Sequence, residues 1–354
     1  MQQDTIYIKE TFRLAKKALG KTFPNPMVGA VIVKNGVVIA KGYHRKAGQP
    51  HAEIDALSQA GKKTKGTTMY INLEPCCHYG KTPPCVKEII QKGIKRVVCA
   101  ALDPNPKVNG KGVRELQKAG IDVTTNILDH EARILNEQFF VFHEKKRPFI
   151  ALKFAASMDG KIATKEYDST WITNEKARSF ARKLRSNFQA TLVGVNTVIH
   201  DNPSLGTNTK DPLRIVLDTG LRIPLTSNVL RDSNILIATT ENANRQKKEQ
   251  LEKRGVELII LKGEKISLLE LLKKLADREV ISIFVEGGSQ TLGSFADEKL
   301  VDKVYAFHAP LLIGGKNAVS AIGGNGPKKL KEAIRLKTVQ RQSFADNMLT
   351  IGYV

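Results

Sequence analysis

Histidine, glutamate and cysteine residues in the first half of the chain occur in an order that can bind a metal ion and use it. One residue separates His51 from Glu53, and the pair Pro75-Cys76 follows farther along the sequence. In nucleobase deaminases, one histidine and two cysteines hold Zn²⁺ with a position left for water, and a glutamate that is not a ligand transfers protons. The pattern therefore predicts hydrolytic deamination of a nucleobase-like ring, with Glu53 as the catalytic residue.

The second cysteine ligand does not stand where that signature usually has it. Three positions after Cys76 the sequence has Tyr79, and Cys77 is too close to Cys76 to share its metal easily. Cys85 is the candidate, because it would begin the next helix, whose amino-terminal dipole favours a thiolate. A purely structural zinc site is the alternative, although such sites usually take four protein ligands and would leave Glu53 without a role.

The second half contains a glycine cluster that could bind a phosphate group. A buried strand is expected over 281–285, Glu286-Gly287-Gly288-Ser289 follows it, and a helix is expected to begin near Gln290. Small residues at a helix start let backbone N–H groups approach a phosphate, although the same turn could be a plain connector. No G-x-G-x-x-G motif follows a strand in this sequence, so a standard Rossmann nucleotide site is not predicted.

Hydrophobic periodicity predicts the elements that position these residues. A helix is expected over 4–20, and the Asn35-Gly36 pair predicts a hairpin between strands over 28–33 and 37–41. Further strands are expected over 69–73, 96–102 and 121–125, with helices beginning near His51, Cys85 and Gly112. This alternation of strands and helices predicts an α/β sandwich for the first half of the chain.

A charged stretch that ends in a proline, 144–148, predicts a boundary between two domains, 1–145 and 146–354. The length of 354 residues also suits two domains of ordinary size. Beyond the boundary, short runs rich in valine and isoleucine alternate with helical segments, which predicts a second α/β domain with a largely parallel sheet. Its strands are expected over 149–156, 190–195, 213–218, 235–239, 256–261 and 281–285.

The composition argues against disordered, secreted and membrane proteins. Hydrophobic residues make up 41% of the chain and charged residues 26%, which predicts a folded protein. The amino terminus lacks the pattern of a signal peptide, and no apolar run is long enough to cross a membrane, so we expect a cytoplasmic protein without a membrane partner. The formal net charge of +21 could attract nucleic acid, but the lysines are scattered, which favours a basic surface that attracts small phosphorylated substrates.

Four segments of the first half match the motifs of one family in the same order. The segment 75–85, PCCHYGKTPPC, closely resembles a motif of the bifunctional riboflavin-biosynthesis deaminase/reductase family, in which the longer cysteine spacing is normal. The segments 23–29, 42–44 and 103–106 resemble the same family. The resemblance implies a cytidine-deaminase-like α/β/α sandwich. It also implies zinc on His51, Cys76 and Cys85, proton transfer by Glu53, and substrate contacts from Asn25, His44, Lys81, Asp103 and Asn105.

The segments 153–163, 194–198, 201–205 and 286–288 resemble the reductase domain of that family, which has a dihydrofolate-reductase-like α/β fold. The resemblance implies NADPH contacts from Ala155, Trp171, Thr197, Asp201, Thr219, Gly288, Ser289, Gln290, Thr291, Leu292, Gly293 and Ser294. It implies contacts to the substrate ribose phosphate from Lys153, Ser169, Arg185, Leu205 and Glu286. Because hydride must reach a sugar carbon, a nearby lysine or acid should polarise that carbon and supply a proton. Lys153 and Glu286 are the catalytic candidates, and their division of labour stays open.

One substrate position departs from the family pattern. Where the family usually has an arginine that would grip the substrate phosphate with two hydrogen bonds, this chain has Asn208. Either Arg185 and a nearby cation such as Lys210 make the phosphate contact instead, or the affinity for the phosphate is lower.

The resemblance as a whole implies a zinc deaminase, with one zinc per chain, fused to an NADPH-dependent reductase. The first domain would remove the 2-amino group of 2,5-diamino-6-ribosylamino-4(3H)-pyrimidinone 5′-phosphate. The second would reduce the ribosyl chain of 5-amino-6-(5-phosphoribosylamino)uracil to ribityl. Self-association is expected because the family is often oligomeric. The alternatives are a nucleic-acid deaminase with an accessory domain, which the net charge would favour, and a non-catalytic protein that binds zinc and phosphate.

Overall fold

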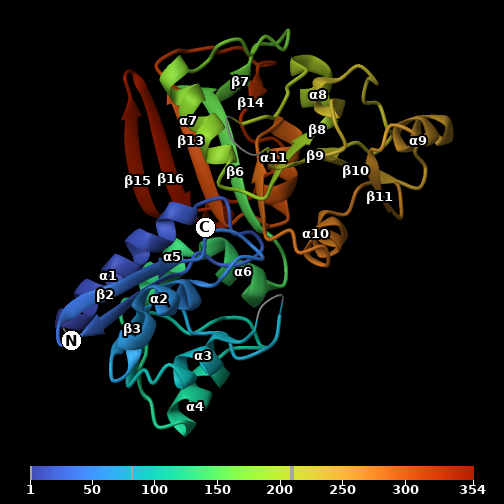
Figure 1. Cartoon of the computed structure of the whole chain (residues 1–354). Coiled ribbons are helices and arrows are strands. Elements are labelled where there is room, and N and C mark those ends of the chain that lie inside the picture. The colour runs from blue at the N-terminus through green and yellow to red at the C-terminus, as the bar shows by residue number, and fades with distance from the viewer. Residues whose placement is uncertain (1, 81–82, 208–210) are drawn as a thin grey trace. The chain divides into compact units, whose positions relative to one another are not determined.

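The computed structural model describes residues 2–80, 83–207 and 211–354 (Figure 1). The chain divides into two compact units, Met1–Arg147 and Pro148–Val354. Among the described residues, no helix combines the length and the apolar character that a membrane span requires. Lys81, Asn208 and Lys210, which the sequence singled out, lie outside the described residues.

The first unit is built on a five-stranded sheet with the order β2-β1-β3-β4-β5. The strand β1 is antiparallel to β2 and β3, whereas β3, β4 and β5 run parallel. The two residues between β1 and β2, Asn35 and Gly36, have φ values of 50° and 77°, as a type I′ hairpin turn requires. The predicted hairpin is therefore confirmed. The strands are β1 (Gly29–Lys34), β2 (Val37–Tyr43), β3 (Thr68–Ile71), β4 (Arg96–Cys99) and β5 (Asp122–Thr124).

Helices cover both faces of this sheet because successive strand residues point to opposite sides. Ile32 belongs to a core with Leu57, Ile89 and Leu116, whereas its neighbour Val31 belongs to a second core formed with α1, α5 and α6. This arrangement confirms the predicted α/β/α sandwich. The helices are α1 (Gln2–Ala15), α2 (Ala52–Ala60), α3 (Cys85–Gln91), α4 (Lys111–Lys118), α5 (Asp129–Leu135) and α6 (Glu137–Lys145), with the short 3₁₀ turns η1 (Lys16–Ala18) and η2 (Gly61–Thr64).

The second unit is built on a nine-stranded sheet with the order β11-β10-β9-β8-β12-β6-β13-β16-β15. Neighbouring strands are parallel from β11 to β13, and β16 is antiparallel to both of its neighbours, β13 and β15, which confirms the expected largely parallel sheet. The strands are β6 (Phe149–Ser157), β8 (Ala190–Gly194), β9 (Leu213–Leu217), β10 (Ile235–Thr240), β11 (Glu257–Leu261), β12 (Ser282–Val285), β13 (Lys303–Ala309), β15 (Lys337–Phe344) and β16 (Asn347–Tyr353). A separate two-stranded sheet pairs β7 (Lys161–Ala163) with β14 (Val319–Ser320).

The crossover helices of the second unit also pack on both faces of their sheet. On one face, alternate residues of the strands form a core with Leu271 and Leu272 of α10 and Phe295 of α11. On the other face, the intervening strand residues form a core with Val198 of α8 and Leu251 of α9. The strands β8, β12 and β6 lie side by side, so their carboxyl ends meet at one edge, where such sheets bind ligands. The helices are α7 (Glu175–Arg185), α8 (Val195–Asp201), α9 (Arg245–Glu252), α10 (Leu268–Ala276) and α11 (Ser289–Asp297), with the 3₁₀ turns η3 (Asn228–Leu230) and η4 (Leu330–Glu332).

Candidate active sites

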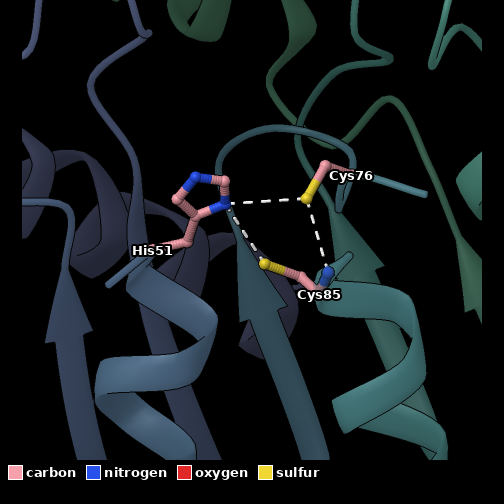
Figure 2. Close-up of side chains that lie close together, drawn as sticks. All are labelled: His51, Cys76 and Cys85. Atoms are coloured by element: carbon pink, nitrogen blue, oxygen red, sulfur yellow. Dashed lines mark hydrogen bonds between the residues drawn. The ribbon is translucent and has the colours of Figure 1, made fainter. Parts of the chain in front are cut away.

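His51, Cys76 and Cys85 converge at one end of the first sheet (Figure 2). His51 immediately precedes α2, Cys76 follows β3, and Cys85 is the first residue of α3, as the sequence predicted. The Nδ1 atom of His51 lies 3.3 Å from Sγ of Cys85 and 3.6 Å from Sγ of Cys76, and all three ligand atoms lie within 4.8 Å of one another. Tetrahedral zinc with bonds of about 2.0–2.3 Å places its donors at about these separations, so the donor set fits zinc with one position left open.

Hydrogen bonds prepare one thiol of this cluster for metal binding. The backbone N–H of Cys85 donates to Sγ of Cys76 over 3.4 Å. The hydrogen bonds from the Cys85 and His51 side chains lower the pKa of the Cys76 thiol to about 4. Thiolate is the form that binds metal, so the protein favours the ligating form of Cys76 before any ion arrives.

Glu53 lies beside this cluster in the first turn of α2 without being one of its three ligands. Its side chain is buried, and the loss of solvation raises the pKa of its carboxyl group. It also interacts directly with the Cys85 thiol. A carboxyl group with a raised pKa next to an open metal position can both accept and return a proton.

Asn25 and His44 form a hydrogen-bonded pair beside the cluster. The Nδ1 atom of His44 lies 3.1 Å from the Pro50 carbonyl oxygen, which can only accept, so Nδ1 carries the proton. The Nε2 atom then accepts from the Asn25 amide over 3.1 Å. The His44 ring also meets the His51 ring edge-on, with centroids 5.2 Å apart. Two predicted substrate residues thus have fixed orientations next to the predicted metal ligands.

Glu74 positions the loop that carries Asp103 and Asn105, and sequence reasoning missed it. The buried Glu74 carboxylate accepts backbone N–H bonds from Asp103 (3.2 Å), Gly110 (2.9 Å) and Val113 (3.0 Å). The Asp103 carboxylate in turn accepts from the Asn105 N–H over 2.7 Å, and burial raises the pKa of Asp103 to about 7. The one sequence signal for Glu74 was its position directly before Pro75-Cys76. The residues that bond to its carboxylate lie about 30 to 40 positions later, so no local pattern predicts them.

We expect Glu74→Gln to raise KM for the deaminase substrate about five- to tenfold, since an amide can satisfy only part of these three buried donors. Zinc content and NADPH oxidation should stay unchanged. Steady-state kinetics of ammonia release check this, with Glu115→Gln, an exposed glutamate of α4, as the matched control. Equal KM values in the two variants would contradict the assigned role of Glu74.

Arg185, Glu286 and Lys153 converge at the carboxyl-end edge of the second sheet. Arg185 ends α7, and its Nε and Nη2 atoms donate to the two Glu286 carboxylate oxygens over 2.5 and 3.0 Å. Its Nη1 atom donates to the Gly206 carbonyl. Burial lowers the pKa of Lys153 on β6; the Glu286 carboxylate opposes this shift and Arg185 adds to it. The three side chains therefore form one electrostatic cluster.

The turns that begin α8 and α11 pack against each other beside this cluster. The Gly288 N–H donates to the Thr197 hydroxyl over 2.9 Å, and a Cβ on Gly194 would lie only 2.5 Å from the Thr291 hydroxyl. Gly287 has a φ of 140°, which L side chains rarely adopt. The glycines thus allow the two helix starts to approach closely and present their backbone N–H groups at the same edge.

The other predicted cofactor residues are spread around the second unit. Asp201 accepts from the Ser169 hydroxyl over 3.4 Å, and the exposed Trp171 lies under the Arg178 guanidinium at 4.2 Å. Hydroxyl groups of Thr239 and Thr240 donate to the Thr219 carbonyl. Ala155 lies on β6 opposite Phe307 of β13. In α11, the Ser289 carbonyl accepts from the Gly323 N–H, and the Ser294 hydroxyl donates to the Gln290 carbonyl. Gly293 packs against the backbone of Gly323 and Gly324. The Leu292 side chain lies in the core, so only its backbone can face a ligand.

Comparison with known proteins covers both units. A family model of the "cytidine and deoxycytidylate deaminase zinc-binding region" matches residues 1–101, and the "RibD C-terminal domain" matches residues 148–350. The riboflavin biosynthesis protein RibD of Aquifex aeolicus is 45% identical over 98% of this chain and 97% of its own length. The chain belongs to the RibD family. The RibD protein of Bacillus amyloliquefaciens is 43% identical over 94% of this chain and 92% of its own length.

Solved RibD structures have the same fold over the whole chain. A structure of Acinetobacter baumannii RibD matches with a TM-score of 0.90 at 33% identity and covers 99% of both chains. A Thermotoga maritima structure, titled a diaminohydroxyphosphoribosylaminopyrimidine deaminase/5-amino-6-(5-phosphoribosylamino)uracil reductase, matches with a TM-score of 0.86 at 35% identity and the same coverage.

Membership in the RibD family confirms the main expectations from the sequence. The protein is a bifunctional deaminase and reductase of riboflavin biosynthesis. Its deaminase domain is of the zinc-binding kind, and its second domain matches the RibD C-terminal domain.

Proposed function

We propose that the first domain, residues 1–145, hydrolyses the 2-amino group of the diaminopyrimidinone ribosylamine phosphate. The observation that carries this proposal is the convergence of His51, Cys76 and Cys85 beside the buried Glu53. Zinc held by these three residues supplies the Lewis acidity that makes water a nucleophile near neutral pH. Glu53 takes the proton from the attacking water and returns it to the leaving amino group, so that ammonia departs.

The substrate of the deaminase would be oriented by residues that the protein already holds rigidly. Asn25 is fixed by His44, and Asp103 and Asn105 are fixed by each other and by Glu74. Amide and carboxyl groups of this kind can bond to the polar edge of a pyrimidinone ring. Lys81, which lies outside the described residues, remains a proposed substrate contact on the strength of the family motif.

The second domain, residues 146–354, then reduces the ribosyl chain of the deaminated product with NADPH. Lys153 is the proposed proton donor, because both Glu286 oxygens already accept hydrogen bonds from Arg185. Glu286 holds Arg185 in place, and its negative charge raises the pKa of Lys153 against the effect of burial. Ser169 and Leu205 contact the substrate. The closely packed starts of α8 and α11, with Thr197 and Gly288, are the proposed site for the cofactor phosphates. NADPH supplies the hydride.

The whole proposal can be tested on one sample. Ammonia release and NADPH oxidation are measured on the diaminopyrimidinone ribosylamine phosphate, and the metal content is determined on the same protein. One zinc per chain with both activities is the expected result. Zinc and ammonia release without NADPH consumption would refute the reductase half, and binding of RNA in place of both activities would favour the nucleic-acid deaminase.

Restoring the arginine that the family usually has should improve the reductase. We expect Asn208→Arg to lower KM for the reductase substrate about tenfold, the order of effect of a charge-assisted contact to phosphate. All three Arg185 side-chain nitrogens already donate to Glu286 or Gly206. This supports weaker binding of the substrate phosphate by the wild-type enzyme. Asn208→Gln is the matched control for size and polarity. An unchanged KM in Asn208→Arg would show that other groups already bind the phosphate.

We further propose that the enzyme acts in the cytoplasm as a homo-oligomer, in keeping with the resemblance to its family and with its use of NADPH. Light scattering coupled to size-exclusion chromatography would give the mass in solution, and a monomer at micromolar concentration would contradict the proposed self-association.

A further inference from the structure

The turn around Leu205 has a strained backbone. Leu205 has a φ of 51° and Asn202 a φ of 40°, both in the left-handed region. This conformation is unfavourable for a leucine, because Cβ approaches the following carbonyl oxygen. The Leu205 side chain is buried, which fixes the turn from the inside. Strained residues persist only where their surroundings hold them, and they are common in ligand-binding turns.

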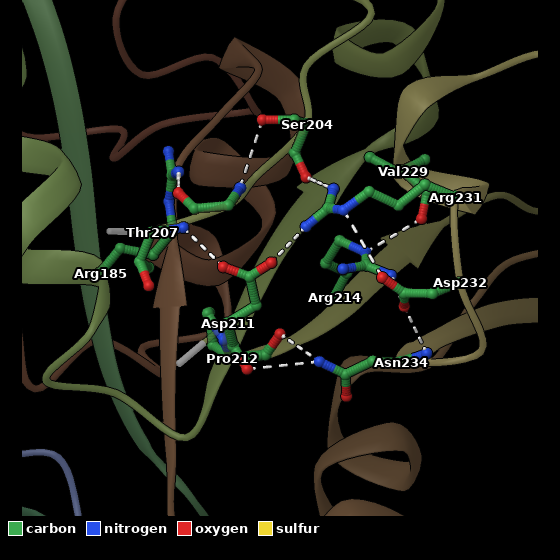
Figure 3. A network of polar contacts seen from close by, with 11 residues as sticks. Arg185, Ser204, Thr207, Asp211, Pro212, Arg214, Val229, Arg231, Asp232 and Asn234 are labelled. Atoms are coloured by element: carbon green, nitrogen blue, oxygen red, sulfur yellow. Dashed lines mark hydrogen bonds and ion pairs between the residues drawn. The ribbon is translucent and has the colours of Figure 1, made fainter. Parts of the chain in front are cut away.

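Two arginines hold the carbonyl groups on either side of Leu205. Arg231 donates through Nη1 to the Ser204 carbonyl, and Arg185 donates to the Gly206 carbonyl (Figure 3). The Nη2 atom of Arg231 also pairs with Asp211 over 2.5 Å. The other oxygen of Asp211 accepts from the Thr207 N–H over 2.7 Å. Arg231 and Asp211 thus form a clasp around the turn.

The clasp is anchored to the core of the domain. Asp232 lies 3.5 Å from Nε of Arg231, and it pairs with Arg214, which is completely buried. Arg214 also donates to the Val229 carbonyl over 2.9 Å. If Asp232 moved away, the buried Arg214 guanidinium would lose this ionic partner, which is costly. Figure 3 shows this chain of contacts from Arg214 through Asp232 to Arg231 and Ser204.

Two further hydrogen bonds from the same segment hold Asn202, the other left-handed residue of the turn. The Asn228 backbone N–H donates to the Asn202 side-chain oxygen over 2.8 Å. The Asn228 amide donates to the Asn202 carbonyl over 2.9 Å. The segment 228–232 therefore supports both left-handed residues of the 202–207 turn by separate hydrogen bonds.

We propose that the segment 228–232 holds the 202–207 turn in the shape that receives the ribose phosphate of the reductase substrate, and that Arg231 is its main positioning residue. The inference rests on the proposed function in one respect, which is that the substrate contacts Leu205. Arg231 touches neither substrate nor cofactor; it acts through the Ser204 carbonyl and Asp211. Substrate affinity should therefore depend on Arg231 more strongly than the binding of NADPH does.

The test is Arg231→Gln in the full chain. Because small displacements of a binding group have large kinetic effects, KM for the reductase substrate should rise about tenfold. The NADPH Kd, measured by nucleotide fluorescence, should stay within about twofold, and ammonia release by the same chain should not change. Arg245→Gln is the matched control, since Arg245 is an exposed arginine of α9 paired only with Glu249 in the contacts described for it. It should leave every value at the wild-type level.

A double-mutant cycle tests the clasp itself. Asp211→Ala should raise KM in the same direction, and the double variant Asp211→Ala/Arg231→Gln should be no worse than the poorer single variant, because coupled residues are not additive. An unchanged KM in Arg231→Gln, a parallel rise of the NADPH Kd, or fully additive single effects would each overturn the inference. A wild-type enzyme that reduces no substrate would instead overturn the proposed function, and the inference with it.

Discussion

Replacing Glu53 by glutamine is expected to lower ammonia release about a thousandfold, because an amide of the same shape can no longer accept and return the proton. The buried position of Glu53 suits this exchange, since glutamine needs no ionic partner there. Zinc content should stay at one per chain, because Glu53 is not among the three grouped donors. NADPH oxidation on the deaminated substrate should also be unchanged. Ammonia release and metal analysis on one preparation are the measurements.

Asp55→Asn is the control for this experiment. Asp55 lies on the same helix, but its carboxylate accepts from the Tyr43 backbone N–H and pairs with Arg45. The Asp55→Asn variant should release ammonia within about twofold of wild type, because a partly exposed ion pair contributes little. If Glu53→Gln kept a tenth or more of the activity, Glu53 would not be the proton-transfer group, and a structural role for the zinc would become the better explanation.

The second large effect is expected for Lys153→Met, which should lower NADPH oxidation by about two to three orders of magnitude while ammonia release is unaffected. Methionine keeps the length of the apolar stem and removes the proton donor. Burial lowers the pKa of Lys153, so the protonated form that donates is present below this lowered pKa and is lost above it. The wild-type rate should therefore fall as the pH rises through that value, whereas the residual rate of the variant should lack this fall.

Lys176→Met, on the exposed face of α7, is the matched control and should keep the wild-type pH profile. A variant at Lys153 that retained both its rate and the decline at high pH would exclude this lysine as the donor. In that case Glu286 would become the first residue to replace, because it is the other catalytic candidate beside the substrate turn.

The candidate zinc ligands and Glu53 could be picked out from the sequence because most of them are tied to a local signal. His51 and Glu53 lie at the start of a helix, and Cys85 begins the next helix after two prolines. The Asn35-Gly36 turn sets the pairing register of the first two strands. Turns and helix starts are set by a few neighbouring residues, so their sequence patterns carry over to the folded chain.

Other elements gave no such signal. The strand β15 is exposed along almost its whole length, so it lacks the alternation of polar and apolar residues that identifies a half-buried strand. The strand β13 begins with the buried Lys303, whose amino group donates to the Tyr353 hydroxyl on β16. The strand β15 pairs with β16, and β13 pairs with both β6 and β16; neither strand was expected.

The sequence by itself determined the candidate zinc ligands, the alternation of strands and helices, and the order of family motifs, because these depend on residue type and short spacing. Only the tertiary structure decided that Arg185 pairs with Glu286, that Glu74 holds the Asp103 loop, and that Arg231 supports the turn at Leu205. The physical reason is that buried charges and strained backbones are stable only with particular partners. Those partners come from distant parts of the chain, and packing alone brings them together.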